Sequence, residues 1–200
     1  MTSKPIAFRS LEAATQELKA ILSDSVDARR VVMAIGGAVG SGKSTLASGL
    51  GGVVVATDDY LPNYAQTAAH LRDAPESSNL PGLSRDLLLL KERGAAEVPT
   101  WCFKTHQRIG TRSVAAERVI ICEGIFALHP VLAESIDIRV MVSADRATRW
   151  KRWEAIEEAG ERGWGVERAR RHFDEVAEPT YSKHARLYES SLDYIVYNSG

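Results

Sequence analysis

One eight-residue segment, Gly37-Ala38-Val39-Gly40-Ser41-Gly42-Lys43-Ser44, matches the pattern G-x-x-x-x-G-K-[ST] and constrains the fold more than any other feature. It lies between an apolar run at 30–35, typical of a buried strand, and a run at 44–50 that favours a helix. Such a loop wraps backbone N–H groups around a polyphosphate and directs a helix N-terminus at the anion. We therefore expect a bound nucleotide at this segment and at Thr45; a glycine-rich turn without a ligand is the alternative.

Length and charge exclude several classes of protein. Two hundred residues are enough for one α/β domain, and 25 basic against 26 acidic residues give a net charge of -1. This balance provides no long-range attraction to nucleic acid or to a membrane, so neither is expected as a partner. The spacing of Cys102 and Cys122 is typical of neither a metal site nor a redox pair, so both are expected to be buried free thiols. The first residues lack the apolar stretch of a signal peptide. We expect a cytoplasmic protein.

Strand patterns alternate with helix patterns along the chain, which predicts a largely parallel sheet. The expected strands are 30–35, 53–57, 98–103, 119–122, 138–142 and 194–197, and the expected helices are 10–24, 44–50, 83–94, 145–160 and 166–190. Residues 61–82 hold no long apolar pattern and are expected to form a loop region on the substrate side. The predicted fold is an α/β three-layer sandwich of the P-loop NTPase type, with a mainly parallel five-stranded sheet.

Acidic residues follow two of the predicted strands, at the sheet edge where open α/β proteins bind their ligands. Ser44 and Glu123 are candidate ligands for a metal ion that neutralises the phosphates, with Asp58 as a further candidate. Asp58 is also placed to accept a proton from an attacking hydroxyl, and Asp59 competes with it for that role. Glu123 could instead be an ordinary acid at a strand end, and either aspartate could cap the next turn.

Basic residues recur along the helix expected at 145–160. Arg146, Arg149 and Arg152 are three residues apart and share one face, which could close over the phosphates, as could Arg162. A solvated basic face paired with nearby glutamates is the alternative. We favour Arg149, Arg152 and Arg162.

Three further stretches carry a resemblance. They are Thr57-Asp58-Asp59-Tyr60, Val98-Pro99-Thr100-Trp101-Cys102-Phe103-Lys104-Thr105-His106-Gln107-Arg108, and Glu123-Gly124-Ile125-Phe126-Ala127-Leu128. In order and spacing the chain resembles the uridine kinase and phosphoribulokinase family over about residues 31–197, and is nearest to uridine kinases. The resemblance implies one kinase domain over 1–200, with a helical preface at 1–28 and a lid at about 145–165. Uridine kinases continue well past the last strand, whereas this chain stops at Gly200.

The resemblance also implies roles for individual residues. Asp58 matches the general base, and Ser44 and Glu123 match metal ligands. Trp101 and His106 match positions that hold the nucleobase, where Trp101 replaces a Tyr, and Glu76 falls where a carboxylate binds the ribose. Without that motif, Trp101 could equally be a core aromatic, and His106 a structural histidine. The full set expected to bind the acceptor is Asp58, Tyr60, Glu76, Trp101, Phe103, His106 and Arg108; Lys43, Arg149 and Arg152 join Asp58 as catalytic residues, and Arg162 contacts the nucleotide.

The predicted function is transfer of the γ-phosphoryl group of ATP, with Mg²⁺, to a hydroxyl of a small molecule. Uridine or cytidine is the favoured acceptor; pantothenate, glycerate, a sugar or ribulose 5-phosphate are the alternatives. A nucleotide-dependent switch is a remoter alternative, because the chain lacks the guanine-binding signature of GTPases. A kinase-like protein that only binds nucleotide is another. The sequence leaves open whether the chain forms a homo-oligomer.

Overall fold

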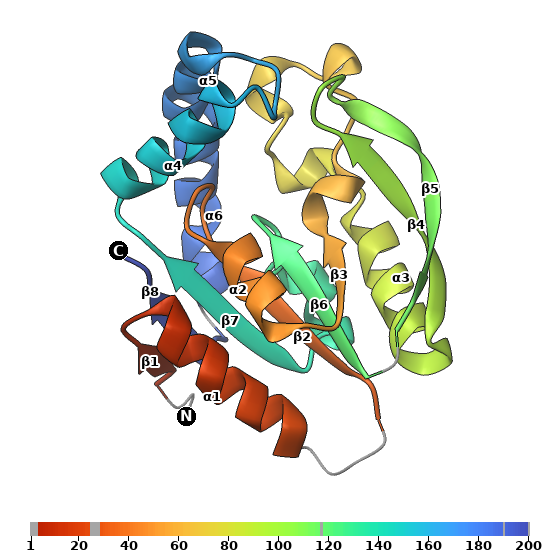
Figure 1. The fold of residues 1–200 in the computed structure, drawn as a ribbon. Helices are drawn as coiled ribbons and strands as arrows, with labels where there is room; N and C mark the ends of the chain where they lie inside the picture. Colours follow the sequence, from red (N-terminus) through yellow and green to blue (C-terminus); the bar gives the residue numbers. More distant parts are fainter. Residues whose placement is uncertain (1–3, 25–28, 117, 190, 200) are drawn as a thin grey trace.

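A single parallel sheet forms the centre of the computed structural model, which describes residues 4–24, 29–116, 118–189 and 191–199 (Figure 1). Six strands lie in the order β1-β8-β7-β2-β6-β3, and every neighbouring pair is parallel. Their bounds are β1 Ile6–Phe8, β2 Val31–Gly36, β3 Val53–Ala56, β6 Val119–Gly124, β7 Ile138–Ser143 and β8 Tyr194–Tyr197. The predicted α/β class is confirmed.

The sheet has one strand more than the five we predicted. Strand β1 pairs with β8 through Ile6–Tyr194, Ala7–Ile195 and Phe8–Val196. A three-residue strand gives no usable alternation of polar and apolar residues, and Ile6 is largely exposed, so the sequence carries little signal for it.

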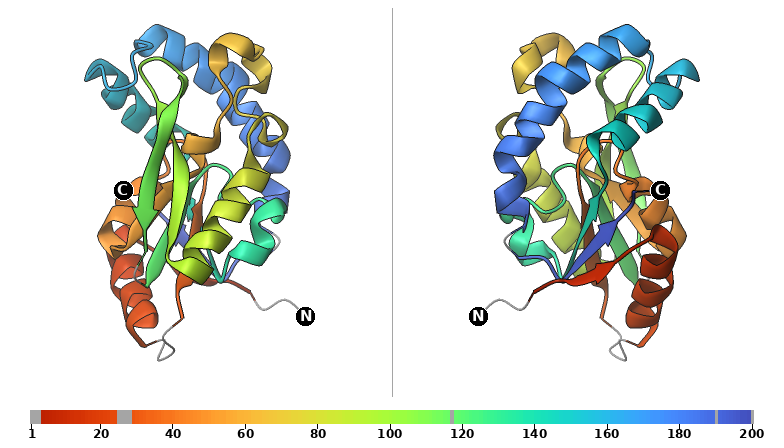
Figure 2. Two further views of the ribbon diagram at one scale, coloured as in Figure 1. Left: turned by 90° about the vertical axis from the view of Figure 1, so that its right-hand side faces the viewer. Right: turned by 90° about the vertical axis from the view of Figure 1, so that its left-hand side faces the viewer.

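Helices cover both faces of the sheet, which makes three layers (Figures 1 and 2). Successive side chains of a strand point to opposite faces. In β2, Met33 and Ile35 pack in the same cluster as residues of α1 and α2, whereas Val32 and Ala34 pack in the cluster that holds α3. The helices are α1 Leu11–Asp24, α2 Lys43–Leu50, α3 Leu80–Arg93, α4 Arg146–Glu158, α5 Val166–His172 and α6 Glu178–Glu189.

A separate antiparallel hairpin consists of β4, Ala95–Cys102, and β5, Gln107–Ala115. The predicted extended segment at 98–103 lies within β4, but β5 was not predicted. Seven of the first eight residues of β5 are exposed, including Ile109. The sequence therefore shows no alternation of buried and exposed residues from which this strand could be predicted. The hairpin stands beside α3 and reaches toward the lid (Figure 1).

The lid extends further than the predicted 145–165: α4, α5 and the loop between them, residues 146–172, lie above the carboxyl ends of the strands and share a small core (Figure 1). Trp153 of α4, Ala169 of α5 and Phe173 pack together there. A π-helical turn, Phe173–Ala177, joins α5 to α6. The stretch predicted as one helix at 166–190 is therefore α5, this turn and α6.

The segment between β3 and α3 contains no α-helix or strand, in agreement with the predicted loop region. It is built from short 3₁₀ turns at Thr57–Tyr60, Tyr64–Gln66, Ala69–Leu71 and Pro75–Ser77, and a fifth such helix lies at Pro130–Ser135. Helix α3 begins three residues before its predicted start, because the side chain of Asn79 accepts a hydrogen bond from the N–H of Gly82 and caps it.

Two of the expectations drawn from composition can be compared with the described residues. Both cysteines are free, and Cys122 is buried as expected, but Cys102 is partly exposed. Within the described part of the chain, none of the helices combines the length and the apolar character needed to cross a membrane.

The core face of α3 gives the first prediction. Leu87 is fully buried, so Leu87→Ala should lower the free energy of unfolding by about 2–5 kcal/mol through lost transfer energy and a cavity. Urea denaturation followed by circular dichroism measures the change. The half-exposed Val131, changed to Ala, is the control and should cost about 0.5 kcal/mol or less. Equal losses would show that α3 does not pack on the sheet as described.

Candidate active site

The phosphate loop has the backbone that its glycines were expected to allow. Gly37, Gly40 and Gly42 all have positive φ, and Gly42 is the left-handed residue that precedes α2. A Cβ added to Gly40 would lie 2.4 Å from the carbonyl oxygen of Arg149, so there is no room for a side chain. The loop therefore depends on glycine for both conformation and close packing.

Neighbouring elements hold the loop from outside. Arg152 of α4 donates to the carbonyls of Gly40 and Ser41 at 3.2 and 3.3 Å. Asn198, just after β8, donates to the carbonyl of Ser41 at 2.7 Å. These bonds satisfy carbonyl oxygens and use none of the loop N–H groups, of which that of Ser41 donates to the carbonyl of Ala38. N–H groups that stay unpaired are what phosphate binding requires.

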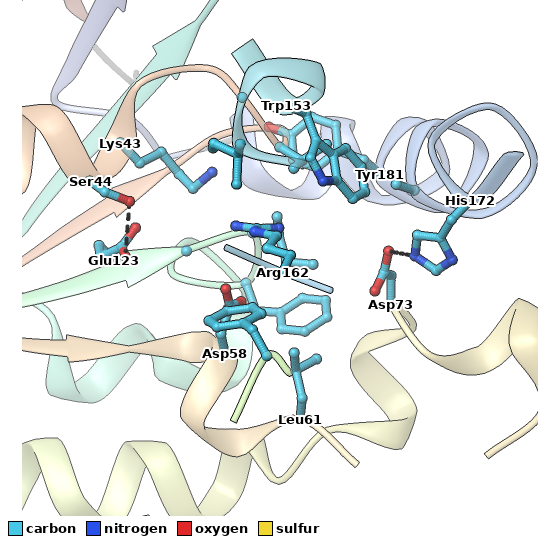
Figure 3. A pocket seen from close by; sticks show the side chains of 18 of the residues that line it. Lys43, Ser44, Asp58, Leu61, Asp73, Glu123, Trp153, Arg162, His172 and Tyr181 are labelled. Carbon is cyan, nitrogen blue, oxygen red and sulfur yellow. Dashed lines mark hydrogen bonds and ion pairs between the residues drawn. The ribbon is translucent and has the colours of Figure 1, made fainter. Parts of the chain in front are cut away.

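Lys43 is almost completely buried at the start of α2, and its Nζ donates to the carbonyl of Ala38 at 3.0 Å. Burial lowers the pKa of this ammonium, while the carboxylates of Glu123 and Asp58 raise it. The charge is thus stabilised by two acids that lie around the same cavity (Figure 3).

Ser44 and Glu123 lie together, as their candidate roles require. The Ser44 hydroxyl donates to Oε1 of Glu123 at 3.2 Å (Figure 3). Glu123 lies near the end of β6, level with Ile35 of β2 and Ala56 of β3. Burial raises the pKa of its carboxyl, and Lys43 opposes that shift. A hydroxyl and one carboxylate suit Mg²⁺, which keeps waters and substrate phosphates as its other ligands.

The two consecutive aspartates have different surroundings. Asp58 lines the cavity, where burial raises its pKa and Arg162 and Lys43 lower it. Asp59 instead accepts the N–H of Trp101 at 3.0 Å and contacts Arg112 at 3.2 Å, so it fastens the 3₁₀ turn to the hairpin. Of the two, only Asp58 is available to a ligand.

One cavity of about 350 Å³ extends from the phosphate loop to α6. Thirteen of the predicted residues line it: Val39, Gly40, Gly42, Lys43, Ser44, Thr45, Asp58, Trp101, Phe103, His106, Glu123, Arg152 and Arg162. Gly37, Ala38 and Ser41 are not lining residues and belong to the body of the loop. Figure 3 shows the guanidinium of Arg162 between Lys43 and Asp58.

Other side chains of the lining were not predicted, among them Tyr64, Asp73, Trp153, Trp164, His172, Tyr181 and His184. They come from the 3₁₀ region, the lid and α6, which are far apart in the sequence. The one local signal was the position of Trp164, two residues after Arg162. The others lie outside the three motif stretches quoted in the sequence analysis.

The carboxylate beside the aromatic rings is that of Asp73, and the prediction of Glu76 was wrong. Asp73 accepts a hydrogen bond from the Tyr64 hydroxyl at 3.1 Å and pairs with Nε2 of His172 at 2.9 Å. Glu76 is two-thirds exposed and lies 4.0 Å from His184. The turn Pro75–Ser77 carries Glu76 away from the cavity.

Tyr60 and Arg108 were also wrongly predicted to contact the acceptor. Tyr60 is buried in the core, where its hydroxyl donates to Asp86 at 2.9 Å. Arg108 is exposed on β5, and its backbone N–H donates to the side chain of Asn63. Neither residue lines the cavity.

Arg149 was predicted to be catalytic, but its guanidinium is held in a structural position outside the cavity lining. It is buried and forms a bidentate pair with Glu178, one bond of which is 2.8 Å. It also donates to the carbonyl of Ala144 at 3.0 Å and to that of Val39 at 3.4 Å. Arg149 therefore joins the lid, α6 and the phosphate loop.

A comparison of the sequence with protein-family models identifies the family. The model of the Phosphoribulokinase / Uridine kinase family matches residues 32–198. The chain belongs to this family. Membership of the phosphoribulokinase/uridine kinase family implies a P-loop kinase of small molecules that uses ATP.

Curated relatives include uridine kinases. The chain is 26% identical over 185 residues to uridine kinase of Lactobacillus helveticus, which covers 85% of this chain and 87% of the relative. It is 28% identical over 131 residues to uridine-cytidine kinase B of Dictyostelium discoideum, covering 64% of this chain. That match spans 54% of the Dictyostelium protein, about half of its length. A 119-residue match to inorganic pyrophosphatase TTM2 of Arabidopsis thaliana spans 18% of that protein.

Solved structures of low identity share the fold. A Silicibacter sp. TM1040 protein titled "putative fructose transport system kinase" superposes with a TM-score of 0.71 at 23% identity, covering 93% of this chain and 98% of its own. D-glycerate 3-kinase from Cryptococcus neoformans superposes with a TM-score of 0.63 at 15% identity, covering 94% and 95%. The chain shares its architecture with P-loop kinases that are named for different substrates.

The burial of Asp58 predicts a stabilising substitution. Because burial raises its pKa, the charged carboxyl destabilises the folded state at neutral pH, and this cost vanishes as the pH falls through the folded-state pKa. Asp58→Asn should therefore raise Tm at pH 8. Thermal unfolding between pH 4 and 8 measures the change, and the gain should disappear in acid.

Asp59→Asn is the matched control for this measurement. It removes the ion pair with Arg112 and weakens the bond to the hairpin, so Tm should fall or stay level at pH 8. If both substitutions lower Tm equally, Asp58 is a structural anchor like its neighbour.

Proposed function

We propose that the protein transfers the γ-phosphoryl group of ATP to a hydroxyl of an uncharged small molecule, with a nucleoside such as uridine or cytidine as the first candidate. The observation that carries the proposal is the continuity of one cavity. Its phosphate end has Lys43, Ser44 and Glu123, its middle has Asp58 and Arg162, and its other end is lined by aromatic rings. A nucleotide phosphate and an acceptor could therefore meet at Asp58.

The groups around that meeting point suit phosphoryl transfer, which depends mainly on positioning and on charge stabilisation. Lys43 and the loop N–H groups would bind the phosphates. Ser44 and Glu123 would hold Mg²⁺, which neutralises phosphate charge when bound. Asp58 would accept the proton of the attacking hydroxyl, and Arg162 would stabilise the negative charge that develops on the transferred group.

The acceptor end favours an uncharged molecule. In the described part of the chain, the lysine and arginine residues of the lining are Lys43 and Arg152 at the loop and Arg162 beside Asp58. The far end instead has the carboxylate of Asp73 and several aromatic rings. The ring centres of Trp101 and Tyr64 are 5.2 Å apart there. A phosphorylated acceptor such as ribulose 5-phosphate would meet no further lysine or arginine of the lining there, whereas hydroxyls and a flat ring would find partners.

A panel of acceptors tests the proposal. ADP release is measured with ATP and Mg²⁺ in the presence of uridine, cytidine, other nucleosides, sugars, glycerate, pantothenate or ribulose 5-phosphate. Stimulation by uridine or cytidine is expected. A sugar as sole acceptor would discard the nucleoside and keep the mechanism, and slow release without any acceptor would indicate a switch. No turnover would indicate a protein that only binds nucleotide.

Substitution of each aspartate in turn tests which of the two acts as the general base. Asp58→Asn should lower kcat by about 10²–10⁴, the usual contribution of a general base, and leave ATP binding intact. Lys43→Ala should likewise cost far more than Asp59→Asn, because Asp59 faces the hairpin. Steady-state kinetics and ATP titration measure both, and equal losses at Asp58 and Asp59 would remove Asp58 as the base.

The pH dependence supplies an independent check. Asp58 must be ionised to accept a proton, and burial raises its pKa. The acid limb of kcat/KM should therefore have its midpoint above ~3.9, the value of an unperturbed aspartate. Arg162→Met removes a positive charge that lowers this pKa, so it should move the limb to higher pH. An unmoved limb would mean that another group sets it.

A further inference from the structure

The lid loop between α4 and α5 has little backbone structure of its own. Gly160, Gly163 and Gly165 all have positive φ, a conformation that costs glycine nothing but fixes no regular hydrogen bonds. Two side chains of this loop nevertheless reach the cavity, those of Arg162 and Trp164. Something outside the loop must hold them there.

The buried side chain of Glu157, at the end of α4, makes the contacts that do so. Its Oε2 accepts the backbone N–H groups of Trp164 and Gly165 at 3.2 and 3.1 Å. Its Oε1 accepts Nε1–H of Trp153 at 3.2 Å. Both oxygens of a buried carboxylate thus accept N–H donors, and hydrogen bonds to an ionised acceptor are the strong ones.

Arg162 lies next to the groups that Glu157 binds. The Arg162 guanidinium is 4.7 Å from the ring centre of Phe103, on the hairpin, and 5.6 Å from that of Trp153. Trp153 is the ring that Glu157 orients through its N–H. The carboxylate therefore fixes the loop backbone beside Arg162 and also one of the two rings against which the guanidinium packs.

The same bonds determine where Trp164 lies. Its ring stacks on His106 at 4.7 Å and meets His172 edge-on at 4.6 Å. Its Nε1–H donates to Nδ1 of His106 at 3.3 Å. Through Trp164, the lid loop becomes a wall of the aromatic end of the cavity.

We propose that Glu157 is a positioning residue that fastens the lid loop across the cavity, with Arg162 at the phosphate end and Trp164 at the acceptor end. One buried carboxylate then couples the two halves of the site. The kinetic part of this inference rests on the proposed function, and its structural part does not.

Glu157→Gln tests the proposal in the full chain. A glutamine oxygen can still accept from two N–H groups, but its NH₂ must face the remaining donor, so one set of bonds is lost. Trypsin is added without nucleotide, and cleavage after Arg162 is followed by mass spectrometry. We expect it to accelerate about tenfold to a hundredfold, the range given by losing one hydrogen bond to a charged group, with faster deuterium uptake at residues 161–165.

Glu158→Gln is the matched control, because Glu158 is the exposed neighbour on the same helix and the charge change is identical. It should leave cleavage and turnover unchanged. Faster cleavage confined to Arg162 in Glu157→Gln supports the proposal. Equal cleavage in both variants, or acceleration at every site including those in α6, overturns it, since general loosening is what a merely structural role gives.

Trp153→Phe covers the case in which Glu157→Gln does not fold. It keeps a ring beside Arg162 and removes the N–H that Oε1 accepts, together with part of the ring volume in the lid core. A smaller acceleration confined to Arg162 is expected, and an unchanged rate, or acceleration at every site, overturns the proposal. Where the panel yields an acceptor, Glu157→Gln should raise the acceptor KM and combine non-additively with Trp164→Phe. Where it yields none, the proposed function fails, and the protease result still decides the role of Glu157.

Discussion

The buried ammonium of Lys43 is the interaction on which the rest of the site depends. A buried charge is tolerated only beside compensating charge, and Glu123 and Asp58 provide it at the ends of two neighbouring strands. The dependence is mutual, because Lys43 also lowers the pKa of both acids against the effect of their burial. The parallel register of β2, β6 and β3 is what brings these three charges to one edge of the sheet.

The lid uses its basic residues mainly to build this site. Arg152 and Arg149 bind carbonyl oxygens of the phosphate loop, so α4 is attached to the loop that it overlies. Glu178 neutralises Arg149, which explains how that guanidinium can be buried. Among the three arginines we favoured, Arg162 is the one whose guanidinium lies beside Asp58. It belongs to a glycine-containing loop rather than to the face of a helix.

The sequence predicted the positions of residues well where a short local pattern determines them. The phosphate loop needs glycines at fixed spacing, and an acid directly after a buried strand must lie at the sheet edge, so Asp58 and Glu123 could be located. Prediction failed where a short turn determines which side chains face the cavity. Asp73 and Glu76 are three residues apart, but Asp73 lines the cavity, whereas Glu76 lies within the 3₁₀ turn Pro75–Ser77 and is two-thirds exposed. No periodic pattern records such a turn.

The sequence by itself determined the α/β class, the nucleotide loop and the acids beside it, because these depend on backbone conformation and strand order over short stretches. Only the tertiary structure decided what surrounds the acceptor end. Trp164 of the lid, His106 of the hairpin and His172 of α5 meet there from elements distant in the chain. Their contacts arise from how the lid packs over the sheet, and packing between distant elements leaves no spacing in the sequence from which it could be inferred.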